Sequence, residues 1–241
     1  MQDPLIGRIE ALRRELLSNA RDPAHPPRLL PVTKMQPIER ILPLAAAGIT
    51  EIGENRVQEI MEKYPELGAH FAFHVIGRLQ TNKIKYIIGR VCMVQSLDRP
   101  ALAQALDARA QSMGVRLPVL LEINQGEAQK GGIPPDEAEA LLRYAARLPG
   151  LDVRGLMAVM PLASDPETLR PLFAGMRALQ AQLRDLAVSG VSMDELSMGM
   201  SGDWHIAAQE GATIVRIGSA IFGHRTLGNS QGVGGTNGEF L

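Results

Sequence analysis

A lysine and two glycine-containing turns are the residues of this sequence whose types and positions could do chemistry. Lys34 ends an apolar segment that begins at Arg28. A lysine at the end of a buried strand holds a primary amine beside whatever lies above that strand. Far downstream, the turns at 196–203 and 218–223 flank a segment that carries Arg216. Together, an amine, backbone N–H donors and a guanidinium indicate a phosphorylated aldehyde cofactor that is held as an imine.

The two downstream turns are candidates for binding the phosphate. Three glycines let the backbone approach an anion closely, namely Gly199, Gly202 and Gly218. Ser201 is placed to cap a helix that begins near Asp203, so the start of this helix would present free N–H groups. Ser219 follows the next strand and adds further donors. The alternative is that both turns are ordinary tight turns without a ligand.

Arg216 lies between Val215 and Ile217, so we expect it to be largely enclosed. A buried guanidinium must be paired or hydrogen-bonded. One possibility is an ion pair with a core carboxylate such as Glu122. The other is donation to the pyridine nitrogen of the cofactor. Because arginine stays charged, the second arrangement would leave that nitrogen unprotonated and the ring a weak electron sink.

Other reactive side chains give weaker signals. His74 lies in an apolar segment, where a histidine is more often part of the core than a catalyst. Cys92 also lies in an apolar run and is expected to be a small buried side chain. No cluster of His and Cys has the spacing of a metal site, and the Gly-x-Ser-x-Gly motif is absent. We therefore predict neither a metal nor a catalytic residue.

The elements that would position these residues alternate along the chain. Apolar runs of strand length, several of them near-continuous, predict eight strands, at 28–33, 49–53, 71–76, 91–95, 117–124, 153–159, 193–197 and 213–217. Amphipathic patterns predict helices at 4–19, 37–47, 54–64, 80–88, 101–113, 134–148, 165–186 and 203–209, with Asp98 and Asp165 as N-caps. Eight strands with intervening helices predict an α/β fold, a (β/α)8 TIM barrel. The alternative is an open doubly wound sheet, but no Gly-x-Gly-x-x-Gly turn follows the first strand.

Bulk properties narrow the class of protein. We expect one domain over 1–226, with the helix at 4–19 as an addition, and a disordered Gly-, Ser- and Asn-rich tail at 227–241. The net charge of −1 gives no electrostatic case for nucleic acid or an anionic membrane. No segment is apolar for long enough to span a bilayer, and no signal peptide is evident. The single cysteine fits a reducing cytoplasm.

Several motifs, in this order, resemble the YggS-like pyridoxal phosphate (PLP) homeostasis proteins. They are PVTK at 31–34, GEN at 53–55, FHVIGRLQTNK at 73–83, QKGG at 129–132, GLM at 155–157 and the stretch 196–223. The resemblance runs from Leu29 to Gly223. It implies the alanine-racemase-like barrel of PLP fold type III without the C-terminal β-domain. Two departures, Arg56 where tyrosine is frequent and Val75 where a bulkier residue is usual, would change the surroundings of the cofactor.

The resemblance also implies roles for individual residues. Lys34 would form the internal aldimine with PLP, and Arg216 would face the pyridine nitrogen. The predicted cofactor-binding set is Lys34, Asn55, His74, Met200, Ser201, Arg216, Gly218 and Ser219, of which Ser201, Gly218 and Ser219 would hold the phosphate. Members of the family are thought to carry or buffer PLP, so PLP-dependent apo-enzymes are possible partners, and no catalytic reaction is implied.

Two other functions are open at this point. A PLP-dependent amino-acid racemase needs an electron sink and a base on each face of the substrate carbon. Racemases of this fold add a β-domain that supplies a tyrosine, whereas the tyrosines here, Tyr64, Tyr86 and Tyr144, fall on predicted helices or their ends. Without that domain one dimer interface is also lost, so we expect a monomer. The third possibility is a binding module for another phosphorylated metabolite.

Overall fold

Eight parallel strands form a single sheet in the computed structural model, which describes residues 4–127 and 129–223. The strands are β1 (Arg28–Pro31), β2 (Glu51–Glu54), β3 (Ala72–Val75), β4 (Val91–Leu97), β5 (Leu117–Ile123), β6 (Leu151–Ala158), β7 (Glu195–Ser197) and β8 (Ile214–Ile217). Each overlaps a predicted strand, and the predicted barrel is confirmed. The tail predicted at 227–241 lies outside the described residues.

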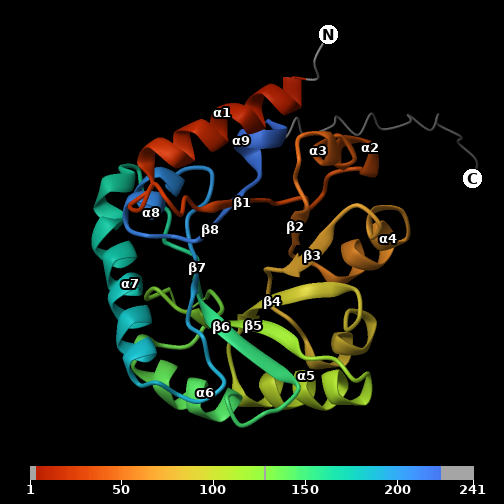
Figure 1. Cartoon of the computed structure of the whole chain (residues 1–241), viewed down its shortest axis with the longest axis vertical. Coiled ribbons are helices and arrows are strands. Elements are labelled where there is room, and N and C mark those ends of the chain that lie inside the picture. Colours follow the sequence, from red (N-terminus) through yellow and green to blue (C-terminus); the bar gives the residue numbers. More distant parts are fainter. Residues whose placement is uncertain (1–3, 128, 224–241) are drawn as a thin grey trace, which may run out of the picture.

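The sheet curls until its two ends meet. Its order is β1-β8-β7-β6-β5-β4-β3-β2, and the arrows follow one another around the centre in Figure 1. The joint between β1 and β2 is a single bridge, Val32 to Gly53, beside a hydrogen bond of 3.0 Å from the Thr33 N–H to the Gly53 carbonyl. Because all strands are parallel, their carboxyl ends open on one side of the barrel, where barrels hold their ligands.

Helices cover the outside of the sheet (Figure 1). The α-helices are α1 (Pro4–Asn19), α2 (Ile38–Ile41), α3 (Pro43–Ala46), α4 (Val57–Leu67), α5 (Pro100–Ser112), α6 (Ala138–Ala145), α7 (Arg170–Asp185), α8 (Trp204–Gln209) and α9 (Ser219–Phe222). Three 3-10 helices are η1 (Thr81–Tyr86), η2 (Pro135–Glu137) and η3 (Pro166–Leu169). The additional helix α1 buries one face, Leu5, Ile9, Leu12 and Leu16, against α3, α8 and α9.

Local differences from the prediction have identifiable causes. The helix predicted at 37–47 is broken into α2 and α3, because Pro43 supplies no N–H to the preceding turn. The stretch at 80–88 forms the tighter η1. The prediction of Asp98 as an N-cap is wrong, since Arg99 takes that place without a side-chain bond. Asp165 does cap its helix, accepting a hydrogen bond of 3.0 Å from the Glu167 N–H.

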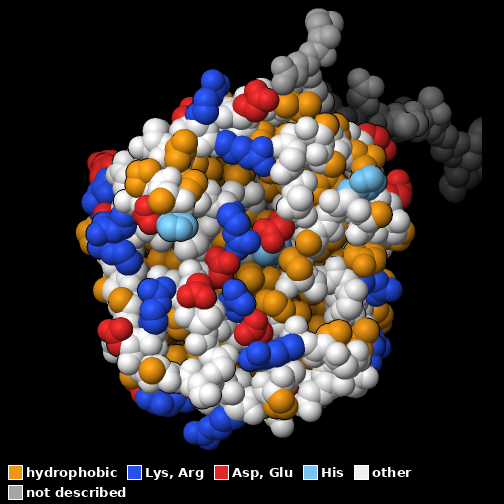
Figure 2. Space-filling model, in the orientation of Figure 1, with side chains coloured by type: hydrophobic (Ala, Val, Ile, Leu, Met, Phe, Trp, Pro, Cys, Tyr) orange, Lys and Arg blue, Asp and Glu red, His pale blue; other side chains and the backbone are white. Residues whose placement is uncertain are grey.

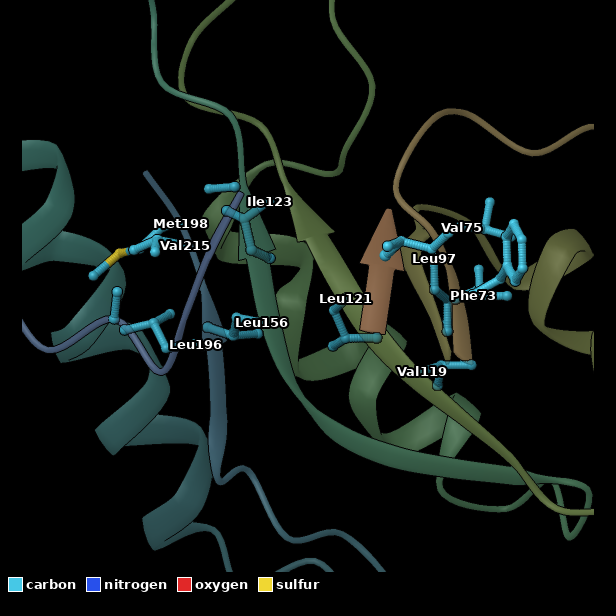
Figure 3. Close-up of a cluster of buried hydrophobic side chains, with 14 of the residues drawn as sticks. Phe73, Val75, Leu97, Val119, Leu121, Ile123, Leu156, Leu196, Met198 and Val215 are labelled. Carbon is cyan, nitrogen blue, oxygen red and sulfur yellow. The ribbon is translucent and has the colours of Figure 1, made fainter. Parts of the chain in front are cut away.

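An apolar core lies between the sheet and the helices. Figure 3 shows part of it, with side chains from β3 to β8 and the residue after β7: Phe73, Val75, Leu97, Val119, Leu121, Ile123, Leu156, Leu196, Met198 and Val215. All of these side chains are buried. The barrel also contains buried polar side chains, among them His74, Gln95, Ser197 and Arg216.

Gly155 marks the tightest contact between two strands. A Cβ at this position would lie 1.8 Å from the carbonyl oxygen of Glu195 on β7. We expect Gly155→Ala to destabilise the fold by about 3 kcal/mol, because strand backbones cannot move apart without losing their ladder. Urea unfolding measures this. The control is Gly175→Ala on α7, where a Cβ meets nothing within 4 Å, and which should gain about 0.5–1 kcal/mol. Equal stabilities for the two variants would contradict the prediction.

Candidate functional site

A cavity of about 440 Å³ opens at the carboxyl ends of β1, β7 and β8. It gathers six of the eight predicted site residues: Lys34, Met200, Ser201, Arg216, Gly218 and Ser219. Val32, Gln36, Gly202, Phe222 and Gly223 complete its lining. The fold places them together because β8 lies between β1 and β7 in the sheet.

The Lys34 amine is free to react. It makes no hydrogen bond or ion pair within the described part of the chain, and the side chain is half-buried in the turn after β1. A second lysine nearby differs, since Lys63 on α4 donates to the Thr33 carbonyl (2.8 Å), Glu54 Oε1 (2.7 Å) and Glu59 Oε2 (2.9 Å). These three hydrogen bonds give the Lys63 amine a structural role. Of these two lysines, Lys34 is therefore the one whose amine lines the cavity without a partner in the described part of the chain.

Two predicted residues lie outside the main cavity. Asn55 lines a smaller space of about 210 Å³ that it shares with Lys34 and Arg56, so Lys34 stands between the two cavities. His74 does not reach either one. It is 1% exposed, and its Nδ1 lies 2.9 Å from Gln95 Nε2 inside the barrel. Any influence of His74 on the cavity must pass through other side chains.

The turns after β7 and β8 present backbone donors to the cavity. The prediction that Ser201 caps α8 is wrong, because Asp203 is the N-cap residue and accepts a hydrogen bond from the Met200 N–H (2.6 Å). Ser201 Oγ instead accepts long bonds from the N–H groups of Gly218 (3.3 Å) and Ala220 (3.4 Å), tying the two turns together. Among the cavity-lining residues of these turns, the N–H groups of Ser201, Gly202 and Ser219 have no acceptor in the described part of the chain.

Arg216 is 3% exposed and is held on two sides by neutral partners. One terminal nitrogen, Nη1, donates to Ser197 Oγ (2.6 Å), and Nη2 donates to the Ala158 carbonyl (2.8 Å). The alternative of an ion pair with Glu122 does not occur in the described part of the chain. Burial lowers the pKa of the guanidinium to about 10, so it stays charged at neutral pH. A buried cation without a partner carboxylate therefore lines the cavity.

Glu122 on β5 is a buried carboxyl with an unpartnered oxygen, Oε2. Burial and the nearby charge of Asp98 raise its pKa from 4.5 to about 7, while Arg216 opposes the rise. The loop that carries Gly131 packs against this carboxyl. Glu122 therefore keeps its proton to a higher pH than an ordinary carboxyl, and it makes no ion pair with Arg216 in the described part of the chain.

This carboxyl predicts a pH-dependent stability. Below pH 4.5 it is protonated in both the folded and the unfolded chain. As the pH rises from about 4.5 towards 7, the unfolded chain loses the proton first, so the free energy of unfolding falls by about 3 kcal/mol. Glu122→Gln should remove this decline. Urea unfolding of both proteins across this range measures the difference, and parallel curves would contradict the prediction.

Glu51, His74 and Cys92 form a cluster at the opposite end of the strands. Their potential ligand atoms lie within 4.8 Å of one another. The His74 Nδ1 accepts the Gln95 amide hydrogen, so Nε2 carries the ring proton. Burial raises the pKa of the Cys92 thiol to about 12. Glu51 Oε1 lies 3.6 Å from His74 Nε2, and Arg28 donates to Glu51 Oε2 at 3.3 Å. A metal here would have to displace the protons of both groups, and we assign no metal to this cluster.

Comparison with known proteins identifies the family. A family model described as the N-terminal domain of alanine racemase matches residues 9–226. The pyridoxal phosphate homeostasis protein of Aquifex aeolicus is 43% identical over 200 residues, which cover 82% of this chain and 87% of the relative. This chain belongs to the pyridoxal phosphate homeostasis family. Another member, from Deinococcus radiodurans, is 42% identical over 87% of this chain and 95% of its own length.

Solved structures agree with the family. PipY from Synechococcus elongatus, with PLP bound, has a TM-score of 0.80 at 33% identity and covers 91% of this chain and 100% of its own. The alanine racemase of Clostridium difficile 630 has a TM-score of 0.73 at 15% identity, a likeness of fold alone. This chain covers only 58% of that racemase. The likeness therefore covers the barrel and not the rest of the racemase chain.

The surface gives no strong charge preference. On the face drawn in Figure 2, basic and acidic side chains are interspersed, and neither sign forms a continuous patch. No helix in the described part of the chain has both the length and the apolar character needed to cross a bilayer.

Proposed function

We propose that this chain binds pyridoxal 5'-phosphate and serves in PLP homeostasis, holding the cofactor at the cavity between β1, β7 and β8. The single observation that carries the proposal is the cavity that gathers the free amine of Lys34 and the unused N–H groups of two turns. An aldehyde and a phosphate on one small molecule match these two features. PipY, which has PLP bound, supports the same ligand.

The residues present fit this cofactor. The N–H groups of Ser201, Gly202 and Ser219 and the Ser201 hydroxyl would hold the phosphate, since backbone donors without partners favour an anion. Arg216 would donate to the pyridine nitrogen from the cavity wall. Met200 would contact the ring, and Asn55 would line the space on the far side of Lys34.

Retention would be covalent. Lys34 would supply the amine that condenses with the aldehyde of the cofactor, with loss of its oxygen as water. The free state of this amine in the described chain supports the assignment, because no ion pair must be broken first.

Arg216 supports storage rather than turnover. A charged guanidinium at the ring nitrogen keeps that nitrogen unprotonated, so the ring withdraws electrons weakly and racemisation is disfavoured. The curated relatives are named as homeostasis proteins. Incubation with single-enantiomer amino acids, followed by chiral chromatography, should give no turnover. Robust racemisation of any of them would replace the storage function by an enzymatic one.

The proposal also covers the compartment, the oligomeric state and the partners of the protein. We expect it to act as a cytoplasmic monomer that supplies PLP-dependent apo-enzymes. The single cysteine, which cannot form an internal disulfide, supports a reducing compartment. Size-exclusion chromatography with light scattering tests the monomer. Mixing the loaded protein with an apo-enzyme and following its activity tests delivery.

The deciding experiment is the absorbance spectrum of protein purified without added cofactor. A band in the near-visible range that borohydride removes, with the mass of the reduced cofactor on the peptide that contains Lys34, is the expected result. No such band, even after PLP is added, would contradict the proposal.

A further inference from the structure

A chain of four buried polar side chains crosses the inside of the barrel. It links Arg216 on β8 to Ser197 on β7, then to Gln95 on β4 and His74 on β3. The three links measure 2.6, 2.6 and 2.9 Å, and each of the four residues is at most 3% exposed. The chain begins at the wall of the cavity and ends below it, at His74 Nε2, which is 3.6 Å from a carboxylate oxygen of Glu51.

Each hydrogen in this chain has a defined direction. A guanidinium can only donate, so Ser197 Oγ accepts from Arg216. The serine proton then goes to Gln95 Oε1. The amide nitrogen of Gln95 in turn faces His74 Nδ1, which accepts. The Arg216 guanidinium at one end therefore sets the direction of all three hydrogen bonds.

The chain also fixes the guanidinium itself. Nη1 is held by Ser197 and Nη2 by the Ala158 carbonyl, so the plane of the guanidinium cannot rotate without breaking a buried bond. In a buried site an unmade bond costs more than in water. The guanidinium group lines the cavity in this single orientation.

We infer that Ser197 and Gln95 are positioning residues, which set the orientation of Arg216 towards the ring nitrogen of the bound cofactor, with His74 fixing the amide of Gln95. The inference rests on the proposed binding of PLP. It gives a role to His74, which does not reach the cavity itself. It also explains why polar side chains occupy the barrel interior at positions where an apolar residue would pack.

A purely structural role is the alternative, because Gln95 and Ser197 join strands on different sides of the barrel. The two roles differ in their consequences. A structural bond affects the stability of the empty protein alone. A positioning bond also changes the affinity for PLP and the absorption band of bound PLP, which depends on what the ring nitrogen contacts.

The test compares Ser197→Ala and Gln95→Met with Ser96→Ala. Ser96 is also fully buried, and its Oγ donates to the Gly77 carbonyl at 2.8 Å, outside the chain. The measurements are the dissociation constant for PLP, the near-visible spectrum, the site of borohydride labelling and the melting temperature of the empty protein. We expect Ser197→Ala and Gln95→Met to bind PLP on the order of tenfold more weakly, with a shifted band and labelling still on Lys34.

Ser96→Ala should lower the melting temperature but leave the affinity and the band at wild-type values. If Ser197→Ala does not fold, Ser197→Cys keeps the packing with a weak acceptor and should show the same losses. Wild-type affinity and an unshifted band in the Ser197 and Gln95 variants would overturn the inference while leaving PLP binding intact. Failure of the wild-type protein itself to bind PLP would instead reject the proposed function, and the inference with it.

Discussion

Lys34→Ala is expected to abolish all borohydride-stable attachment of PLP to this protein. No other amine lines the cavity in the part of the chain that the structure describes. The phosphate donors remain in the variant, so PLP would still bind reversibly through its phosphate. Losing the covalent link should weaken retention by at least a hundredfold, about 3 kcal/mol or more. Dialysis after loading, followed by absorbance and intact mass, measures this loss.

Lys83→Ala is the matched control for this variant. Lys83 lies on η1, with its amine 6.0 Å from the centre of the Tyr86 ring and away from the cavity. It should retain PLP like the wild-type protein. A reduced adduct on Lys83 or Lys130, surviving in the Lys34→Ala protein at full yield, would show that the wrong amine has been assigned.

Lys63→Met is expected to lower the free energy of unfolding by about 3–5 kcal/mol. Lys63 is the cation that pairs with Glu54, whose side chain is fully buried. Removing it leaves a carboxylate without a counter-ion in the core. Burial already raises the pKa of Glu54. The variant should therefore lose less stability in acid, where this carboxyl is protonated in both states. Urea unfolding at several pH values measures the effect.

A double variant supplies the control. In Glu54→Leu/Lys63→Met both charges are gone, so much of the lost stability should return. The same network holds the backbone on either side of Lys34, since Lys63 binds the Thr33 carbonyl and Glu59 accepts from the Met35 N–H (2.6 Å). PLP retention should accordingly stay impaired in the double variant. A single variant as stable as the double one would disprove the pairing argument.

Much of the fold could be predicted because it depends on burial. Apolar runs marked all eight strands, since parallel strands covered on the outside exclude water from both faces. Helix boundaries were less certain, because a residue such as Pro43 can stand at the start of a new helix as well as inside an amphipathic pattern. Glu54, predicted as the start of a helix, instead ends β2, where its carboxylate meets Lys63.

Individual residues of the site could be predicted from the sequence, but the hydrogen bonds between them could not. Lys34 and Arg216 could be placed at strand ends by counting strands. The pairing of Gln95 with Ser197 joins residues 102 positions apart, and no periodicity links β4 to β7. The only signal was a polar residue in each of two apolar strands. The role of Ser201 was misassigned because Asp203 competes for the same helix start.

The joint between β1 and β2 has a consequence for where a bound ligand would leave the barrel. β1 pairs with β8 along four residues, but meets β2 through one bridge at Val32 and Gly53. Lys34 and Asn55 follow on the two sides of that joint and share the smaller cavity. Parting these two strands would widen an opening beside the amine. We therefore expect a bound molecule to leave at this joint without global unfolding of the barrel.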